Sequence, residues 1–135
     1  MSIREKYDAL KLENVKKIVL VKSGNFYVTF ADDAQILSNL LNYKVIKERL
    51  GFPLGSLDKV VRSLTEENFS FIVVENDKVI VDHSSENNGY DALLKKVKKN
   101  EFTKAMNKIL LDRIAYLIES DIDNYEKIKR FIDEL

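Results

Sequence analysis

Few side chains in this sequence have the type and spacing that catalysis requires. His83 is the only histidine among the 135 residues, and its neighbour Asp82 falls on the opposite face of the strand that this segment predicts. Asp32 and Asp33 form an acidic pair that suits either a bound cation or the start of a helix, and helix capping explains both without a further assumption. We therefore predict no catalytic residue and no metal site.

The sequence also lacks the common nucleophile and nucleotide motifs. Gly-x-Ser-x-Gly, His-Glu-x-x-His, Gly-x-Gly-x-x-Gly and Gly-x-x-x-x-Gly-Lys-Ser/Thr do not occur. There is no cysteine, which removes thiol nucleophiles, zinc-thiolate sites and disulfides. We expect a protein that is not an enzyme, needs no cofactor and works through binding.

Length and charge are typical of a single soluble domain. The apolar runs are far shorter than the roughly 20 residues that cross a bilayer, and the N-terminus lacks the apolar core of a signal peptide. We therefore expect a cytoplasmic protein with no membrane partner. With 22 basic and 22 acidic side chains the net charge is zero, whereas a protein that binds nucleic acid mainly through phosphates is usually more basic.

Charge is nevertheless unevenly distributed toward the C-terminus. Residues 91–108 are basic and residues 119–126 are acidic, and such runs usually form solvated helix faces. The alternative is a surface that faces phosphate or a partner. The charged residues concerned are Lys95, Lys96, Lys98, Lys99, Lys104 and Lys108 with Asp91 and Glu101, then Glu119, Asp121, Asp123 and Glu126.

Apolar periodicity predicts the order of elements in the first part of the chain. Residues 3–13 form a helix with Ile3, Tyr7 and Leu10 on one face, and residues 18–21 and 26–30 form two strands of a hairpin. The next helix begins at Asp32 or Asp33, with an apolar stripe of Ile36, Leu37, Leu40 and Leu41. The pattern then predicts a short strand at 43–46, a loop at 51–55, a helix at 57–67 capped by Ser56, and a hairpin at 69–74 and 78–83.

The polar stretch 84–89 reads as a linker, and three helical stripes follow it. We predict an α/β (α+β) domain over residues 1–88, with a mixed sheet of four to six strands flanked by helices, and a helical extension over residues 89–135. The stripes are Tyr90, Leu93, Leu94 and Val97; Phe102, Met106, Ile109, Leu110, Leu117 and Ile118; and Ile122, Tyr125, Ile128 and Ile132.

Residues 24–34, Gly-Asn-Phe-Tyr-Val-Thr-Phe-Ala-Asp-Asp-Ala, together with this order of elements, resemble the N-terminal mismatch-recognition domain of the MutS family of DNA-repair proteins. The family motif is Gly-Asp-Phe-Tyr-Glu-x-Phe, followed by an acidic pair and a helix. A later Gly-Ile-Pro of the family corresponds to residues 51–53. The scaffold positions of the motif in this chain are Gly24, Tyr27, Phe30, Gly51 and Pro53, together with Val28, which stands where the family has its glutamate.

The resemblance implies that Phe26 wedges into a duplex beside a mispaired base, and that a glutamate two residues later hydrogen-bonds to that base. Residues i and i+2 of a strand share a face, so one of them can insert into the duplex while the other contacts the mispaired base. In this chain the second position is Val28, which neither donates nor accepts a hydrogen bond. Family members place basic residues before the Gly-x-Pro turn, so Lys44, Lys47 and Arg49 are candidates for contact with phosphate.

Two interpretations follow. In the first, the chain is a non-enzymatic MutS-like binding module whose partner is DNA or a DNA-processing complex. In the second, Phe26 and Val28 are packing residues of a module that kept the fold and lost DNA recognition, and the helical extension binds a second copy of the chain or another protein. No segment corresponds to the other MutS domains, so we do not expect repair by this chain alone. Exposure of Phe26 distinguishes the two interpretations.

Overall fold

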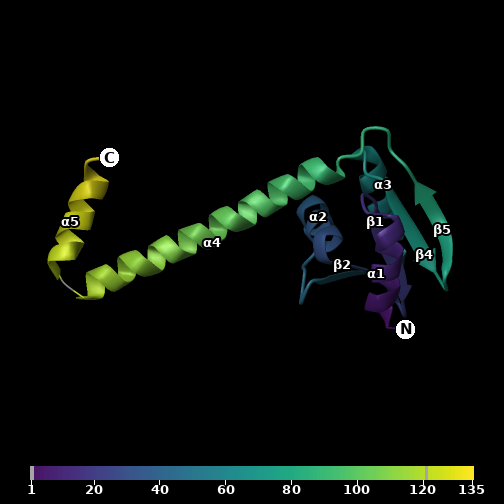
Figure 1. The fold of residues 1–135 in the computed structure, drawn as a ribbon, viewed down its shortest axis with the longest axis horizontal. Coiled ribbons are helices and arrows are strands. Elements are labelled where there is room, and N and C mark those ends of the chain that lie inside the picture. The colour runs from purple at the N-terminus through teal and green to yellow at the C-terminus, as the bar shows by residue number, and fades with distance from the viewer. Residues whose placement is uncertain (1, 121) are drawn as a thin grey trace. The chain divides into compact units, whose positions relative to one another are not determined.

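The computed structural model describes residues 2–120 and 122–135 (Figure 1). Contacts divide the chain into two compact units, residues 1–97 and residues 98–135. The first unit contains α1 (Ile3–Glu13), β1 (Ile18–Ser23), β2 (Phe26–Phe30), α2 (Ala31–Leu41), β3 (Arg49–Pro53), the 3-10 helix η1 (Leu54–Ser56), α3 (Leu57–Glu66), β4 (Phe71–Glu75) and β5 (Lys78–His83). Helix α4 (Tyr90–Ser120) begins in the first unit and continues into the second, which also contains α5 (Ile122–Asp133).

The five strands form one mixed sheet in the order β3-β2-β1-β4-β5. Strands β1 and β4 are parallel, and the other neighbouring pairs are antiparallel. The central strand β1 is buried from Ile18 to Val21, which explains its uninterrupted apolar run, since a strand covered on both faces needs no polar alternation. The sheet and its flanking helices confirm the predicted α/β class.

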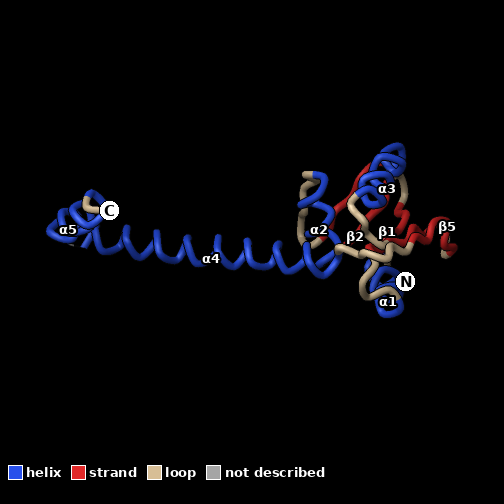
Figure 2. The backbone as a smooth tube through the Cα atoms, turned by 90° about the horizontal axis from the view of Figure 1, so that it is seen from above, coloured by secondary structure: helices blue, strands red, loops and turns tan. Residues whose placement is uncertain are grey.

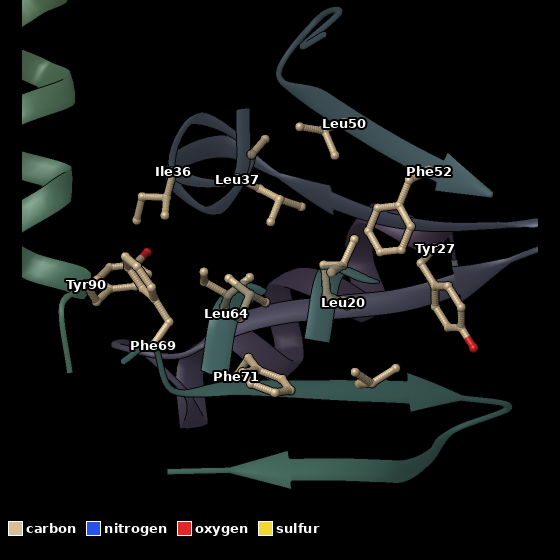
Figure 3. Close-up of a cluster of buried hydrophobic side chains, with 14 residues drawn as sticks. Leu20, Tyr27, Ile36, Leu37, Leu50, Phe52, Leu64, Phe69, Phe71 and Tyr90 are labelled. Atoms are coloured by element: carbon tan, nitrogen blue, oxygen red, sulfur yellow. The ribbon is translucent and has the colours of Figure 1, made fainter. Parts of the chain in front are cut away.

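Helices cover both faces of the sheet. On one face α2, α3 and the start of α4 contribute to the larger apolar cluster, which includes Leu37, Leu64 and Tyr90 (Figure 3). On the other face α1 packs through Tyr7 against a smaller cluster that includes Val28 and Phe30. Figure 2 shows α1 and α3 on opposite sides of the strands. Successive residues of β2 therefore point alternately toward the face that α1 covers and the face that α2 and α3 cover.

The third strand does not lie where the sequence pattern predicted it. The segment 43–46 is not a strand, apart from a single bridge between Ile46 and Arg49, and the predicted loop at 51–55 includes most of β3. In β3 the buried residues Leu50 and Phe52 alternate with the exposed residues Gly51 and Pro53. This glycine and proline made the segment resemble a turn. Proline is tolerated there because β3 is an edge strand of the sheet.

The helical extension consists of two helices instead of the predicted three. The first two apolar stripes lie on α4, a continuous helix of 31 residues whose sequence contains neither glycine nor proline. The placement of Asp121 and the side chains of Ile118, Ile122 and Asp123 are outside the part that the structure describes.

The stretch 84–89 is tied to the sheet through Asn88. The Asn88 side-chain oxygen accepts hydrogen bonds from the backbone of Ser70 at 3.2 Å and of Tyr90 at 3.3 Å, and its amide donates to the carbonyl of Lys16 at 2.7 Å. Asn88 thus satisfies the backbone amide of Tyr90, the first residue of α4. The first turns of α4 pack on the core through Tyr90, Leu93 and Leu94, and the division between the units falls after Val97.

Candidate nucleic-acid interface

Phe26 lies at the start of β2, directly after the two-residue turn of Gly24 and Asn25. The turn requires a left-handed residue, and Gly24 adopts φ 61° without the steric cost that a side chain brings. Phe26 is 49% exposed, whereas the other four residues of β2 are buried. The sequence could not decide this point, because Phe26, Val28 and Phe30 occupy the same face of the strand.

Val28 is an interior residue. It is 1% exposed and belongs to the cluster beneath α1, with Tyr7 and Val19 among its members. Across the sheet it pairs with Gly51, and a Cβ on that glycine would lie 3.5 Å from Cγ1 of Val28. The chain therefore exposes the aromatic position of the motif and buries the position that in the family holds the glutamate.

The three basic candidates lie around one open hollow. Lys44, Lys47 and Arg49 line it together with Arg4, Phe30 and Ile46, and its volume is about 540 Å³. The Arg4 and Arg49 guanidinium carbons lie 5.0 Å and 5.9 Å from the centroid of the Phe30 ring, within the range of cation–π attraction. The sequence pattern did not identify Arg4 as a residue of this hollow, because the apolar period of a helix does not show which strand residues the helix will contact.

A tight hairpin turn presents Lys47. The backbones of Ile46 and Arg49 exchange two hydrogen bonds at 2.9 Å and 3.0 Å, and the two residues between them, Lys47 and Glu48, have φ of 52° and 63°. Such turns favour glycine and asparagine, so a Lys-Glu pair stores backbone strain here. The turn places Lys47 at its tip, where the residue lines the hollow.

Phe26 and the basic hollow lie at opposite ends of β2. Phe30 pairs with Arg49 at one end, and Phe26 pairs with Pro53 at the other. Four residues of extended chain separate the two phenylalanines by about 13 Å. That distance corresponds to about four nucleotide steps along one DNA strand.

Comparison with known proteins identifies the family of this chain. The family model described as MutS domain I matches residues 2–108. The chain belongs to the MutS domain I family. The DNA mismatch repair protein MutS of Thermosipho melanesiensis is 34% identical over 80 residues, which cover 56% of this chain and 9% of that protein. MutS of Prochlorococcus marinus is 26% identical over 83 residues, which cover 54% of this chain and again 9% of the relative.

Other matched positions of the MutS domain I motif support the strand that carries Phe26. Tyr27 is buried against Phe52, with ring centroids 5.8 Å apart, and its hydroxyl donates a hydrogen bond to Glu75. Burial, followed by the hydrogen bond to Glu75, raises the pKa of Tyr27 to about 12. Gly24 forms the turn and Pro53 pairs with Phe26 on the edge strand. These residues position Phe26 by fixing the backbone of β2 and of the turn that precedes it.

The acidic pair of the MutS domain I motif lies in the first turn of α2, as the sequence predicted, but neither residue occupies the cap position. The cap position is Phe30, which makes no side-chain capping bond, and Asp33 is completely buried. Its carboxylate accepts hydrogen bonds from the Tyr7 hydroxyl at 2.7 Å, the Tyr90 hydroxyl at 2.6 Å, the Lys11 ammonium at 2.8 Å and the backbone amide of Val19 at 3.1 Å. Burial, together with the charge of Asp33, raises the pKa of Tyr7 and of Tyr90 above the ordinary value.

Ser56 occupies the predicted cap position of α3 without making the expected side-chain bond, because η1 precedes the helix directly. The His83 ring packs on Phe71, with centroids 5.3 Å apart, and the neighbouring Asp82 pairs with Lys17 at 2.7 Å. Within residues 2–120 and 122–135, no group of three or more histidine, aspartate or glutamate side chains is placed to hold a metal ion. Among the helices described, none has the length and apolarity needed to cross a membrane.

Proposed function

We propose that this MutS domain I is a non-enzymatic DNA-binding module that presses Phe26 against the duplex without a polar contact to the base. The observation that carries the proposal is the half-exposed Phe26 ring on a strand whose other residues are buried. Apolar side chains that wedge between base steps are a common means of binding deformed DNA. The relatives that match this chain are named DNA mismatch repair proteins.

Burial of Val28 determines how selective such a module is. The side chain has no polar atom and lies beneath α1, so no acceptor at this position reaches a base. A good hydrogen-bonded pair contributes about 1–3 kcal/mol of discrimination between bases. Without it we expect mismatched and perfectly paired duplexes to bind with similar affinity.

The basic hollow supplies the phosphate contacts in this proposal. Arg4, Lys44, Lys47 and Arg49 are its four cations, although Arg4 is partly neutralised by Asp8 at 3.1 Å and Glu48 at 3.7 Å. Each phosphate that is neutralised adds about 0.9 to the slope of log affinity against log salt. A zero net charge and few contacts predict weak binding that declines as salt increases.

The test is fluorescence anisotropy with a labelled 25-base-pair duplex, perfect or with one mismatch, at low salt. We expect Phe26→Ala to weaken binding to both duplexes about tenfold or more, because base stacking on an aromatic ring contributes about 1–3 kcal/mol. Phe131→Ala removes an exposed ring from α5, outside the matched residues, and should leave the affinity unchanged. No binding at micromolar protein, or equal effects of the two substitutions, would refute the proposal.

A second candidate function is protein interaction, favoured by the exposed apolar side chains of residues 98–135. Its test is the oligomeric state of the chain, measured by sedimentation equilibrium. The two functions use different surfaces and are separable by substitution.

A further inference from the structure

The basic hollow at the end of β2 combines positive charge with exposed apolar surface. Arg4, Lys44, Lys47 and Arg49 supply the charge, and Ile46, which is 59% exposed, supplies an apolar side chain beside them. The bases of a duplex are stacked inside the double helix, so its backbone offers phosphates to these cations and nothing to the isoleucine. An unpaired nucleotide offers both a phosphate and the face of a base.

Two arginines of the hollow are held against one ring. The guanidinium groups of Arg4, from α1, and Arg49, from β3, both lie over the buried Phe30 ring. The turn beside them is fixed as well, because the backbone carbonyl of Glu48 accepts a hydrogen bond from the amide of Ala31 at 2.9 Å. Groups that are already ordered lose less entropy when a ligand binds. The hollow therefore presents pre-arranged planar donors, which match the oxygens of a phosphate.

Carboxylates of the chain neutralise only part of this positive charge. Asp8 lies 3.1 Å from Nε of Arg4, and Glu48 lies 3.7 Å from Nη1 of the same arginine, which is longer than a hydrogen bond. These two carboxylates against four cations leave an excess of two positive charges. An internal phosphodiester carries one negative charge, whereas a terminal phosphate carries about two at neutral pH. The excess matches a terminal phosphate.

We propose that the basic hollow binds the unpaired nucleotide at the end of a DNA strand, with its terminal phosphate between Arg4 and Arg49 and its base against Ile46. The inference rests on the proposed DNA-binding function and names the part of DNA that the hollow prefers. Its volume of about 540 Å³ is within the usual range of ligand sites, so there is room for a base beside the phosphate. A free nucleoside monophosphate has the same chemistry, and the experiment distinguishes the two sources.

Fluorescence anisotropy tests the site with a duplex that has a short unpaired overhang, made in 5′ and 3′ versions that end in a phosphate or a hydroxyl. We expect the phosphate to tighten binding of at least one version about tenfold, because a charge-assisted hydrogen bond contributes that much. Arg49→Gln should remove this preference. Arg62→Gln is the matched control and should retain it, since Arg62 is exposed on α3, at the other face of the sheet.

A gain of affinity provides a second variant that does not depend on damage to the site. Glu48→Gln removes the carboxylate that competes for Arg4, and it should strengthen binding of the phosphate-ended overhang. Equal binding of phosphate and hydroxyl ends by the unaltered chain, or an equal loss of preference in Arg49→Gln and Arg62→Gln, would overturn the inference.

Competition with thymidine 5′-monophosphate identifies the source of the phosphate. Displacement by the unlabelled overhang alone supports a strand end, whereas a mononucleotide that competes equally well makes a free nucleotide the ligand and overturns the assignment to a strand end. Phe26→Ala should leave the preference for phosphate unchanged. A preference that persists while Phe26→Ala has no effect on perfect duplexes contradicts the proposed function alone, and the reverse result contradicts this inference alone.

Discussion

Asp33 is the residue on which most of the interior polar contacts of the first unit converge. Its carboxylate accepts from two tyrosine hydroxyls, the Lys11 ammonium and the Val19 amide, and these donors come from α1, β1 and α4. A buried carboxylate is tolerated only when such donors replace water. The side chain therefore joins three elements that are distant in the sequence.

We expect Asp33→Asn to lower the free energy of unfolding by about 3–5 kcal/mol, because it removes the charge that the buried donors require. Urea unfolding followed by circular dichroism measures the change. Asp8→Asn is the matched control, since Asp8 pairs with Arg4 on the surface of α1 and such pairs contribute about 0.5 kcal/mol or less. A loss of under 1 kcal/mol in Asp33→Asn contradicts the role given to this carboxylate.

The sequence interpretation of Asp33 was wrong for a physical reason. An acidic residue in the first turn of a helix is a common cap, and a local pattern contains no information about donors from Tyr7, Lys11 and Tyr90. The same limit applied to Phe26 and Val28. Alternation assigned them to one face of β2, and the extent of α1 over that face decided which of them is exposed.

At the scale of elements, the turn between Ile46 and Arg49 is a strained connection. Lys47 and Glu48 both adopt left-handed backbone conformations, each of which costs a residue with a side chain about 1–2 kcal/mol. The turn allows the chain to enter the edge strand β3 beside the basic hollow. Functional side chains often lie on such connections.

We expect Glu48→Gly to raise the free energy of unfolding by about 0.5–1 kcal/mol, because relief of the left-handed strain exceeds the added freedom of the unfolded chain. The surface pair of Glu48 with Arg4 at 3.7 Å contributes little to stability. The urea midpoint measures the effect. Lys59→Gly, on the exposed face of α3, should instead lose about 1 kcal/mol, and a loss in Glu48→Gly as well would show that the turn is not strained.

Elements with a strong period were predicted correctly, and elements interrupted by turn residues were not. The helices at residues 3–13 and 57–67 and both hairpins followed their apolar patterns closely. Strand β3 was missed because Gly51 and Pro53 alternate with its buried residues, and the pairing with β2 outweighs their local preference.

At the scale of the whole molecule, the first helical turns of α4 are part of the MutS domain I core. The Tyr90 hydroxyl bonds to Asp33, and Leu93 and Leu94 pack on the larger apolar cluster. The apparent linker at 84–89 is held by Asn88. We therefore propose that the stable domain ends after Val97, nine residues beyond the boundary at residue 88 that composition suggested.

Two shortened chains test this boundary. A chain that ends at Val97 should unfold cooperatively in urea, because it keeps the Tyr90 bond and the packing of α4. A chain that ends at Gly89 loses those contacts and should be less stable by more than about 3 kcal/mol, the usual cost of removing one large core side chain. Equal stability of the two chains would place the boundary at residue 88.

The sequence alone was enough to identify the MutS domain I family, the mixed sheet and the strand that carries the motif, because apolar periodicity and turn residues act over a few neighbouring positions. Tertiary structure decided that Phe26 is exposed, that Val28 lies beneath α1 and that Asp33 is a buried acceptor. Those outcomes depend on helices that lie far from these residues in the sequence. Exposure is a property of the packed layers, and no local pattern contains it.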